Sequence, residues 1–278
     1  MENYASPLQK YKRQPKLYID LPSKGIWYPK EYLEKAEELE VYSMTANDEI
    51  GLKTPDALYS GVAIKKLIES CVPGIKDAWY VPIVDLDYIL AAIRLASFGP
   101  TIEMNNQCTE CQTKDTYGLE IQKILDHLQL AKPEYEIVIN NFKFKVRPLC
   151  YKEVSQLQQK IFQIRRTLQQ YIMTMEENEE KETKLNELYD QLKDYTFEGV
   201  CSAVTEITTP DGESENKKQF ILDFIKNGDK DFYNKLSVLF EENRKSLSLP
   251  ETTVVCSGCG HSSNVNPDLD YANFFAQG

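Results

Sequence analysis

Four of the seven cysteines form two Cys-x-x-Cys motifs, one in the first half of the chain and one near its end. Two thiolates at this spacing can hold one metal ion from a single tight turn, and Zn²⁺ takes four ligands in a tetrahedron. One motif supplies two ligands, so each motif needs a partner, and the chain has only these two. The pattern predicts one structural zinc site with the ligands Cys108, Cys111, Cys256 and Cys259.

Three other interpretations of the motifs stay open. Each motif could be a metal-free turn, each pair could be a redox dithiol, or His261 could replace one cysteine as a ligand. Neither motif opens a helix within a βαβ pattern, as a thioredoxin-like dithiol would. A catalytic zinc keeps one position open for water, whereas four thiolates close the tetrahedron. A closed structural site is therefore favoured.

The remaining reactive residues form no catalytic constellation. The sequence has no Walker loop, no GxGxxG after a strand, no HExxH and no GxSxG motif. Cys71, Cys150 and Cys201 stand singly among apolar residues and are interpreted as small buried side chains. His127 is expected at the surface of a polar helix, and the acidic run over 176–182 is expected to be solvated. We predict that the protein is not an enzyme.

Composition limits the classes of partner. The 278 residues carry a net charge of −11, which repels phosphate backbones, and no basic stripe with interleaved aromatics occurs. Nucleic-acid binding is therefore disfavoured. No apolar run approaches the roughly 20 residues of a membrane span, and no hydrophobic signal stretch occurs at the N-terminus. With 42% hydrophobic residues the chain can bury a sizeable core, and we expect a protein made in a cytoplasm, without a membrane partner.

The elements that must position the cysteines are short. Residues 101–121 and 252–265 each predict a strand, a tight turn and a second strand, which are the two halves of a zinc ribbon. Thr45 and Asp48 predict a capping box at the start of a helix, and Asp85 is expected to be the N-cap of a later helix. The predicted fold class is α+β, helix-rich with small β-hairpins, a two-part zinc ribbon and a long coiled-coil-like helical insertion.

The same patterns divide the chain into five segments. We expect an extended arm over 1–16, an N-terminal α+β domain with the first knuckle over 17–130, a β-hairpin over 131–150, a long helix or helical hairpin over 151–200, and a helical segment over 201–278 that returns to the second knuckle and a C-terminal tail.

The insertion carries a heptad seam. From Val154 to Met175, apolar residues recur at steps of three and four, and the spacing resumes after the charged stretch at 177–182. One long helix and an antiparallel hairpin that turns near this stretch are both compatible with the pattern, and the hairpin is preferred because each arm could bury its seam against the other. The seam either packs internally or docks a partner.

The C-terminal tail ends in two aromatic residues, Phe274 and Phe275. One interpretation folds both rings onto the chain's own core beside the second knuckle. The other inserts them into a neighbouring subunit, because paired aromatics at a terminus make effective binding anchors.

An ordered set of segments resembles the baseplate proteins of T-even-type contractile-tail bacteriophages, a family of hub components and hub-assembly factors. The segments are LPSKG (21–25), TANDE (45–49), SGVAIKKLIESCVPGI (60–75), DLDYILAAIRLASFG (85–99), CSGCGH (256–261) and LDYANFF (269–275). The resemblance covers both ends of the chain, whereas residues 152–245 are not diagnostic. Gln112 also stands where a glycine often follows a zinc Cys-x-x-Cys motif.

The resemblance implies a structural or assembly role in the central hub of a phage tail baseplate, with other tail and hub proteins as partners. It places the protein in the host cytoplasm during assembly. Some members of such families are retained in the virion tail baseplate and others act only as assembly factors, and the sequence leaves both alternatives open. The alternative is a zinc-ribbon regulator that contacts nucleic acid or a polymerase, which the acidic net charge disfavours.

Overall fold

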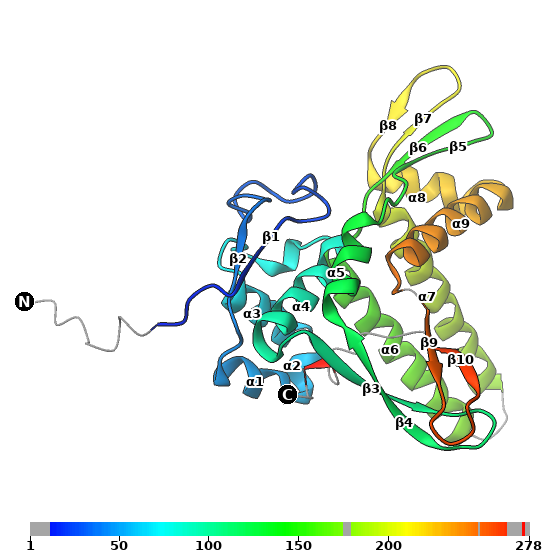
Figure 1. The fold of residues 1–278 in the computed structure, drawn as a ribbon. Coiled ribbons are helices and arrows are strands. Elements are labelled where there is room, and N and C mark those ends of the chain that lie inside the picture. The colour runs from blue at the N-terminus through cyan, green and yellow to red at the C-terminus, as the bar shows by residue number, and fades with distance from the viewer. Residues whose placement is uncertain (1–11, 175–178, 250, 266–273, 276–278) are drawn as a thin grey trace, which may run out of the picture.

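A computed structural model describes residues 12–174, 179–249, 251–265 and 274–275 (Figure 1). Over these ranges the chain forms nine α-helices and ten strands, and every paired strand is antiparallel. The predicted α+β class is confirmed. In the same ranges, no helix is both long enough and apolar enough to cross a membrane.

The first part of the chain, here called the N-terminal unit, packs helices around one apolar core. Helix α4 (Ile83–Phe98) is its centre, and residues on all sides of that helix are buried, among them Leu86, Ile89 and Ile93. A helix that is apolar all round must be surrounded by other elements. The other elements of this core are β1 (Leu17–Ile19), β2 (Leu39–Val41), α1 (Ala46–Leu52), α2 (Pro55–Tyr59), α3 (Val62–Cys71), the short helix η2 (Ala78–Tyr80) and α5 (Ile121–Leu130).

One expectation for this unit is wrong. Helix α4 begins at Ile83, so Asp85 is not its N-cap; the carboxylate is buried and accepts hydrogen bonds from the Ser23 backbone N–H (2.8 Å) and hydroxyl. The Asp85 carboxylate binds the buried turn at Ser23 and is therefore not available to cap the helix. Helices α2 and α3 are separated at Gly61, where φ is 77° and a Cβ would lie 2.6 Å from the Ser155 hydroxyl.

The predicted hairpin over 131–150 is half of a larger sheet. Strands β5 (Glu136–Ile139), β6 (Phe142–Val146), β7 (Val204–Thr208) and β8 (Ser214–Glu215) pair in that order. Asn140 and Asn141 both have positive φ, which is the requirement of a two-residue hairpin turn. Helices α8 (Lys218–Asn227) and α9 (Lys230–Leu247) contribute to a second core with this sheet, where Phe144 is fully buried.

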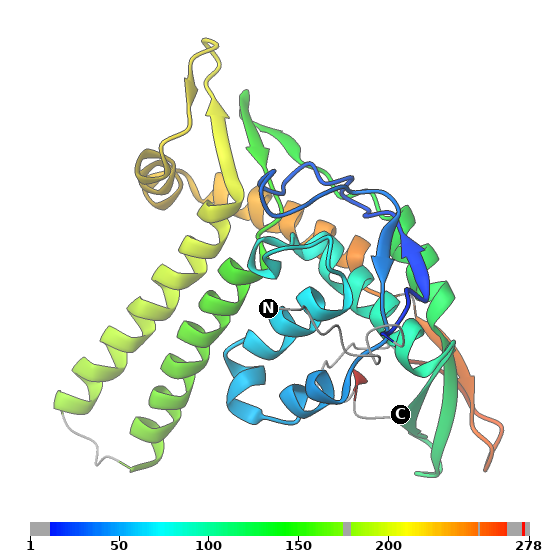
Figure 2. The ribbon, with the colours of Figure 1, turned by 90° about the vertical axis from the view of Figure 1, so that its left-hand side faces the viewer.

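Residues 151–203 contain two helices, α6 (Tyr151–Thr174) and α7 (Glu179–Ala203), that lie side by side (Figures 1 and 2). Ile164 and Leu168 of α6 and Leu188 of α7 are buried between them. These are seam residues, so the heptad pattern packs internally over this stretch. The expected turn falls partly on 175–178, which lie outside the described residues.

Candidate metal centre

The two cysteine motifs form the tips of two β-hairpins. Strands β3 (Thr101–Gln107) and β4 (Lys114–Glu120) flank the first motif, and β9 (Thr252–Val255) and β10 (Ser262–Val265) flank the second. Figure 1 shows the two tips next to each other, although most of the chain separates them in sequence. The fold therefore brings both predicted pairs to one place.

The four sulfur atoms lie at the spacing of a tetrahedral metal site. All four Sγ atoms are within 4.8 Å of one another, with 3.7 Å between Cys108 and Cys259 and 3.5 Å between Cys111 and Cys256. A zinc ion with Zn–S bonds near 2.3 Å requires sulfur atoms about 3.8 Å apart. The donor set and its spacing thus fit Zn²⁺. Among the described residues, the group of potential ligands gathered here consists of these four cysteines and does not include His261.

The two tips have the same backbone geometry. In each, the N–H of the first cysteine donates to the carbonyl five residues on (Thr113 or His261, both 2.9 Å), and the N–H four residues on donates back to the first cysteine (Gln112 and Gly260). That fourth residue has positive φ in both tips, 61° in Gln112 and 73° in Gly260. The missing glycine therefore does not alter the first knuckle: Gln112 adopts the glycine-type conformation, and its side chain accepts a hydrogen bond from Gln107 (2.9 Å).

Further contacts hold one tip against the other. Asp115 on β4 accepts hydrogen bonds from the backbone N–H (2.9 Å) and hydroxyl of Ser257 in the second knuckle. Gly258 faces Thr113, and a Cβ at this glycine would lie 2.6 Å from the Thr113 hydroxyl oxygen. Only a residue without a side chain permits this approach. The second knuckle is thus shaped to sit on the first.

The thiols of the cluster influence one another's ionisation. Hydrogen bonds with the Thr113 side chain and backbone lower the pKa of Cys111 to about 6. The pKa of Cys259 is raised to about 12: the His261 backbone hydrogen bond lowers it, but the neighbouring thiols, led by Cys111, outweigh that effect. Several thiolates this close together need a cation to neutralise them.

The other three cysteines lie elsewhere. Cys71 and Cys201 are buried and Cys150 is half-buried. Burial raises the pKa of Cys71 to about 12 and that of Cys201 to about 11, so both stay as neutral thiols at neutral pH. These positions agree with the interpretation of single cysteines as packing residues.

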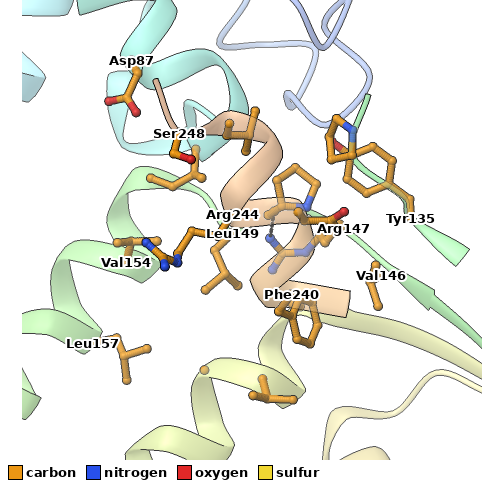
Figure 3. A pocket seen from close by; sticks show the side chains of 18 of the residues that line it. Asp87, Tyr135, Val146, Arg147, Leu149, Val154, Leu157, Phe240, Arg244 and Ser248 are labelled. Atoms are coloured by element: carbon orange, nitrogen blue, oxygen red, sulfur yellow. Dashed lines mark hydrogen bonds between the residues drawn. The ribbon is translucent and has the colours of Figure 1, made fainter. Parts of the chain in front are cut away.

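A cavity of about 610 Å³ lies where the N-terminal unit, the helical pair and α9 meet (Figure 3). Its walls are mainly apolar and include Leu149, Leu157 and Phe240. Two of its charged lining residues are paired, Arg147 with Glu153 (2.5 Å) and Arg244 with Glu241 (2.8 Å). Sequence reasoning missed this cavity because its walls come from segments far apart in the chain, and no local spacing signals it.

The C-terminal aromatic pair is buried in the N-terminal unit. Phe274 and Phe275 are 3% and 4% exposed, and their rings meet edge to face at 5.1 Å. Arg94 of α4 donates to the Phe274 carbonyl and places its guanidinium 5.3 Å from the Phe274 ring centre. The rings thus fold onto the chain's own core, but they pack with the α4 core and not with the cysteine turn.

The motifs that carried the family resemblance hold this unit together. Asp48 of TANDE accepts hydrogen bonds from Thr45, as predicted, and from Ser70 of α3 (3.0 Å), with the Arg13 guanidinium 4.0 Å away. Asp85 binds Ser23 of LPSKG in the same manner. The signature residues are therefore structural contacts between distant segments.

The comparisons with known proteins agree with the motifs. A family model for the T4 bacteriophage base plate protein matches residues 16–276. No curated protein and no solved structure matches this chain. The matched range spans every described element from β1 to the buried aromatic pair. The chain therefore belongs to the T4 bacteriophage base plate protein family.

Proposed function

We propose that this chain is a non-catalytic structural or assembly protein of the baseplate hub, stabilised by one zinc ion and acting through contacts with other tail proteins. The observation that carries the proposal is the four-cysteine cluster at the meeting point of two distant hairpins, in a chain of the baseplate family. Such a cluster is suited to holding a fold together and leaves no coordination position for a substrate.

Cys108, Cys111, Cys256 and Cys259 would hold the zinc ion. The ion supplies a charge-neutralised cross-link between the hairpins, which replaces the apolar packing that so small a pair of strands cannot provide. The chain's own residues prepare the site: Thr113 favours the thiolate of Cys111, and Asp115 fixes the second turn through Ser257.

The partners are other baseplate proteins, met in the host cytoplasm during assembly, with the virion tail as the final location. Two observations support a structural role. The contacts of Asp48 and Asp85 join distant segments inside the chain, and the large cavity has mainly apolar walls with paired arginines.

The proposal is tested by metal analysis combined with assembly. Elemental analysis of the purified chain is expected to find one zinc per chain. A phage lacking this gene is expected to accumulate no complete baseplates in electron micrographs, with assembly restored by the intact gene and not by a Cys256→Ser copy. Intact baseplates without the protein would contradict a hub role. Salt-dependent DNA binding in place of association with tail proteins would instead favour the zinc-ribbon regulator.

A further inference from the structure

From Phe162 to its C-terminal end, helix α6 presents an apolar stripe that nothing in the described chain covers. Phe162 is 52% exposed, Ile172 is 53% exposed and Met173 is 73% exposed. Arg165 and Arg166 lie between them, and steps of three and four residues place this set on one side of a helix. The stripe is distinct from the seam of Ile164 and Leu168, which faces α7.

The N-terminal part of the same helix packs against the N-terminal unit. Tyr151 donates from its hydroxyl to the Gly61 carbonyl (3.1 Å), and Gln159 donates to the Tyr59 carbonyl (3.3 Å). Beyond these contacts a groove of about 640 Å³ lies between α2 and α6, and the rings of Tyr59 and Phe162 meet in it at 5.3 Å. Tyr59 is 45% exposed. The uncovered stripe is therefore adjacent to a groove with an aromatic pair.

The charge of the helical pair is unevenly divided. Helix α6 has four basic residues and one acidic residue, and the acidic one, Glu153, pairs with Arg147. Helix α7 has seven acidic residues and three basic ones. Within the described ranges, Arg165 and Arg166 form no ion pair with either helix or with the N-terminal unit. On a chain of net charge −11, α6 is a local basic surface.

The chain itself contains a matching surface on α7. Tyr189 is 48% exposed and is flanked by the exposed carboxylates of Glu182 and Asp190. Tyrosine is a frequent interface anchor, since it combines a large apolar ring with a polar tip. An acidic helix with an aromatic anchor is complementary to a basic helix with apolar residues.

We propose that α6 of one copy binds α7 of a second copy, so that two helical pairs form a symmetric dimer. A two-fold axis makes the contact twice, since α6 of each copy meets α7 of the other. The result is a four-helix arrangement that covers Phe162, Ile172 and Met173. Association relies partly on exposed charge and weakens as salt is raised.

The test uses the full chain in two charge-reversed forms. Arg165→Glu with Arg166→Glu gives α6 an acidic patch to match the acidic α7, and Glu182→Arg with Asp190→Arg gives α7 a basic patch beside Tyr189 to match the basic α6. Sedimentation velocity is expected to show a dimer for the natural chain and monomers for each variant alone, with association weakened by about tenfold or more through like-charge repulsion. Mixing the two variants is expected to restore a dimer, because each acidic patch then meets a basic one.

The matched control is Lys218→Glu with Lys230→Glu, which changes the net charge by the same amount at exposed positions of α8 and α9; it is expected to dimerise normally. Far-ultraviolet circular dichroism confirms that each variant is folded. A natural chain that stays monomeric at low salt overturns the proposal. Two variants that remain monomeric when mixed, or a dimer unaffected by either reversal, also overturn it.

Discussion

The hairpins β3–β4 and β9–β10 end in matching cysteine turns, but they are attached to the rest of the chain in different ways. The first has seven-residue strands, and the side chains of Ile102 and Leu119 lie in the core of the N-terminal unit. The second has four-residue strands, and no residue of β9 or β10 belongs to any of the apolar cores of the described chain.

The two hairpins are therefore ordered by different interactions. The first hairpin continues directly from α4 into α5 and shares their buried surface, so it can fold with them. An isolated two-stranded hairpin is marginal in water. The second hairpin therefore depends on its tip, where Cys256, Ser257 and Gly258 contact the first knuckle. Metal binding should order one hairpin and leave the other almost unaffected.

The largest expected effect is the loss of the metal. Cys256→Ser removes one of four ligands, and zinc content should fall from one per chain to none, with the apparent binding energy of about 10–16 kcal/mol lost. Hydrogen exchange should become fast in β9 and β10 and stay slow in α4. Cys150→Ser, outside the cluster, is the control and should keep its zinc. Equal protection of β9 in both variants would contradict the dependence on metal.

The C-terminal segment contacts the rest of the chain at two places, the cysteine cluster and the buried aromatic pair. Phe274→Ala removes a ring that is 3% exposed, and a cost of about 3 kcal/mol in the unfolding free energy of the N-terminal unit is expected. Zinc content should stay at one per chain, because the ring lies in the α4 core. The control is Phe220→Ala, an exposed phenylalanine, and denaturant titration is the measurement. A matching loss of zinc would show that the two attachments are not separate.

Asp85 gives the stability of the N-terminal unit a dependence on pH. Burial raises the pKa of Asp85 to about 6, so the folded chain holds this proton more tightly than the unfolded chain does. The resulting stability is present below the unfolded pKa near 4 and is lost as pH rises through about 6, a change of roughly 3 kcal/mol.

This titration is measured by urea unfolding from pH 4 to pH 7 in the Cys256→Ser background, with and without Asp85→Asn. As pH rises, the free energy of unfolding should fall in the chain with Asp85 relative to the Asp85→Asn chain. A difference that is constant with pH would mean that the carboxyl does not titrate in this window.

The smallest effect concerns the close approach of the two tips. Gly258→Ala places a Cβ against the Thr113 hydroxyl, and crowding of about 1–2 kcal/mol should weaken zinc binding by roughly tenfold. Competition with a metal chelator measures the change. Adding Thr113→Ala should recover part of the loss, because the two residues are in contact. Gly51→Ala, with open space around its Cβ, should not affect zinc binding.

Much of this fold follows from local patterns. A hairpin forms within 131–150 and the capping box forms at Thr45, as the sequence predicts, and His127 lies on a helix as expected. The pairing of the two cysteine motifs was accessible because a tetrahedral ion requires four ligands and the chain offers two pairs. The metal itself stays a prediction.

The errors arose where tertiary contacts override local preference. Asp85 has a suitable type and position for an N-cap, but a turn 62 residues earlier uses its carboxylate. Strands β7 and β8 lie in the segment that was expected to be helical, and they were not predicted because β6, the partner of β7, lies on the other side of the helical pair in sequence. The position of Phe274 depends on Arg94, which no spacing rule connects with the C-terminus.

The distance along the chain between the two knuckles sets an order of events during synthesis. Cys111 and its partner Cys256 are 145 residues apart, and a ribosome adding 5–20 residues per second makes the second knuckle roughly 7–30 s after the first. For that interval a nascent chain carries only half a ligand set. A chain released before residue 256 cannot close the tetrahedron, so metal occupancy distinguishes chains that have reached their last cysteine from those that have not.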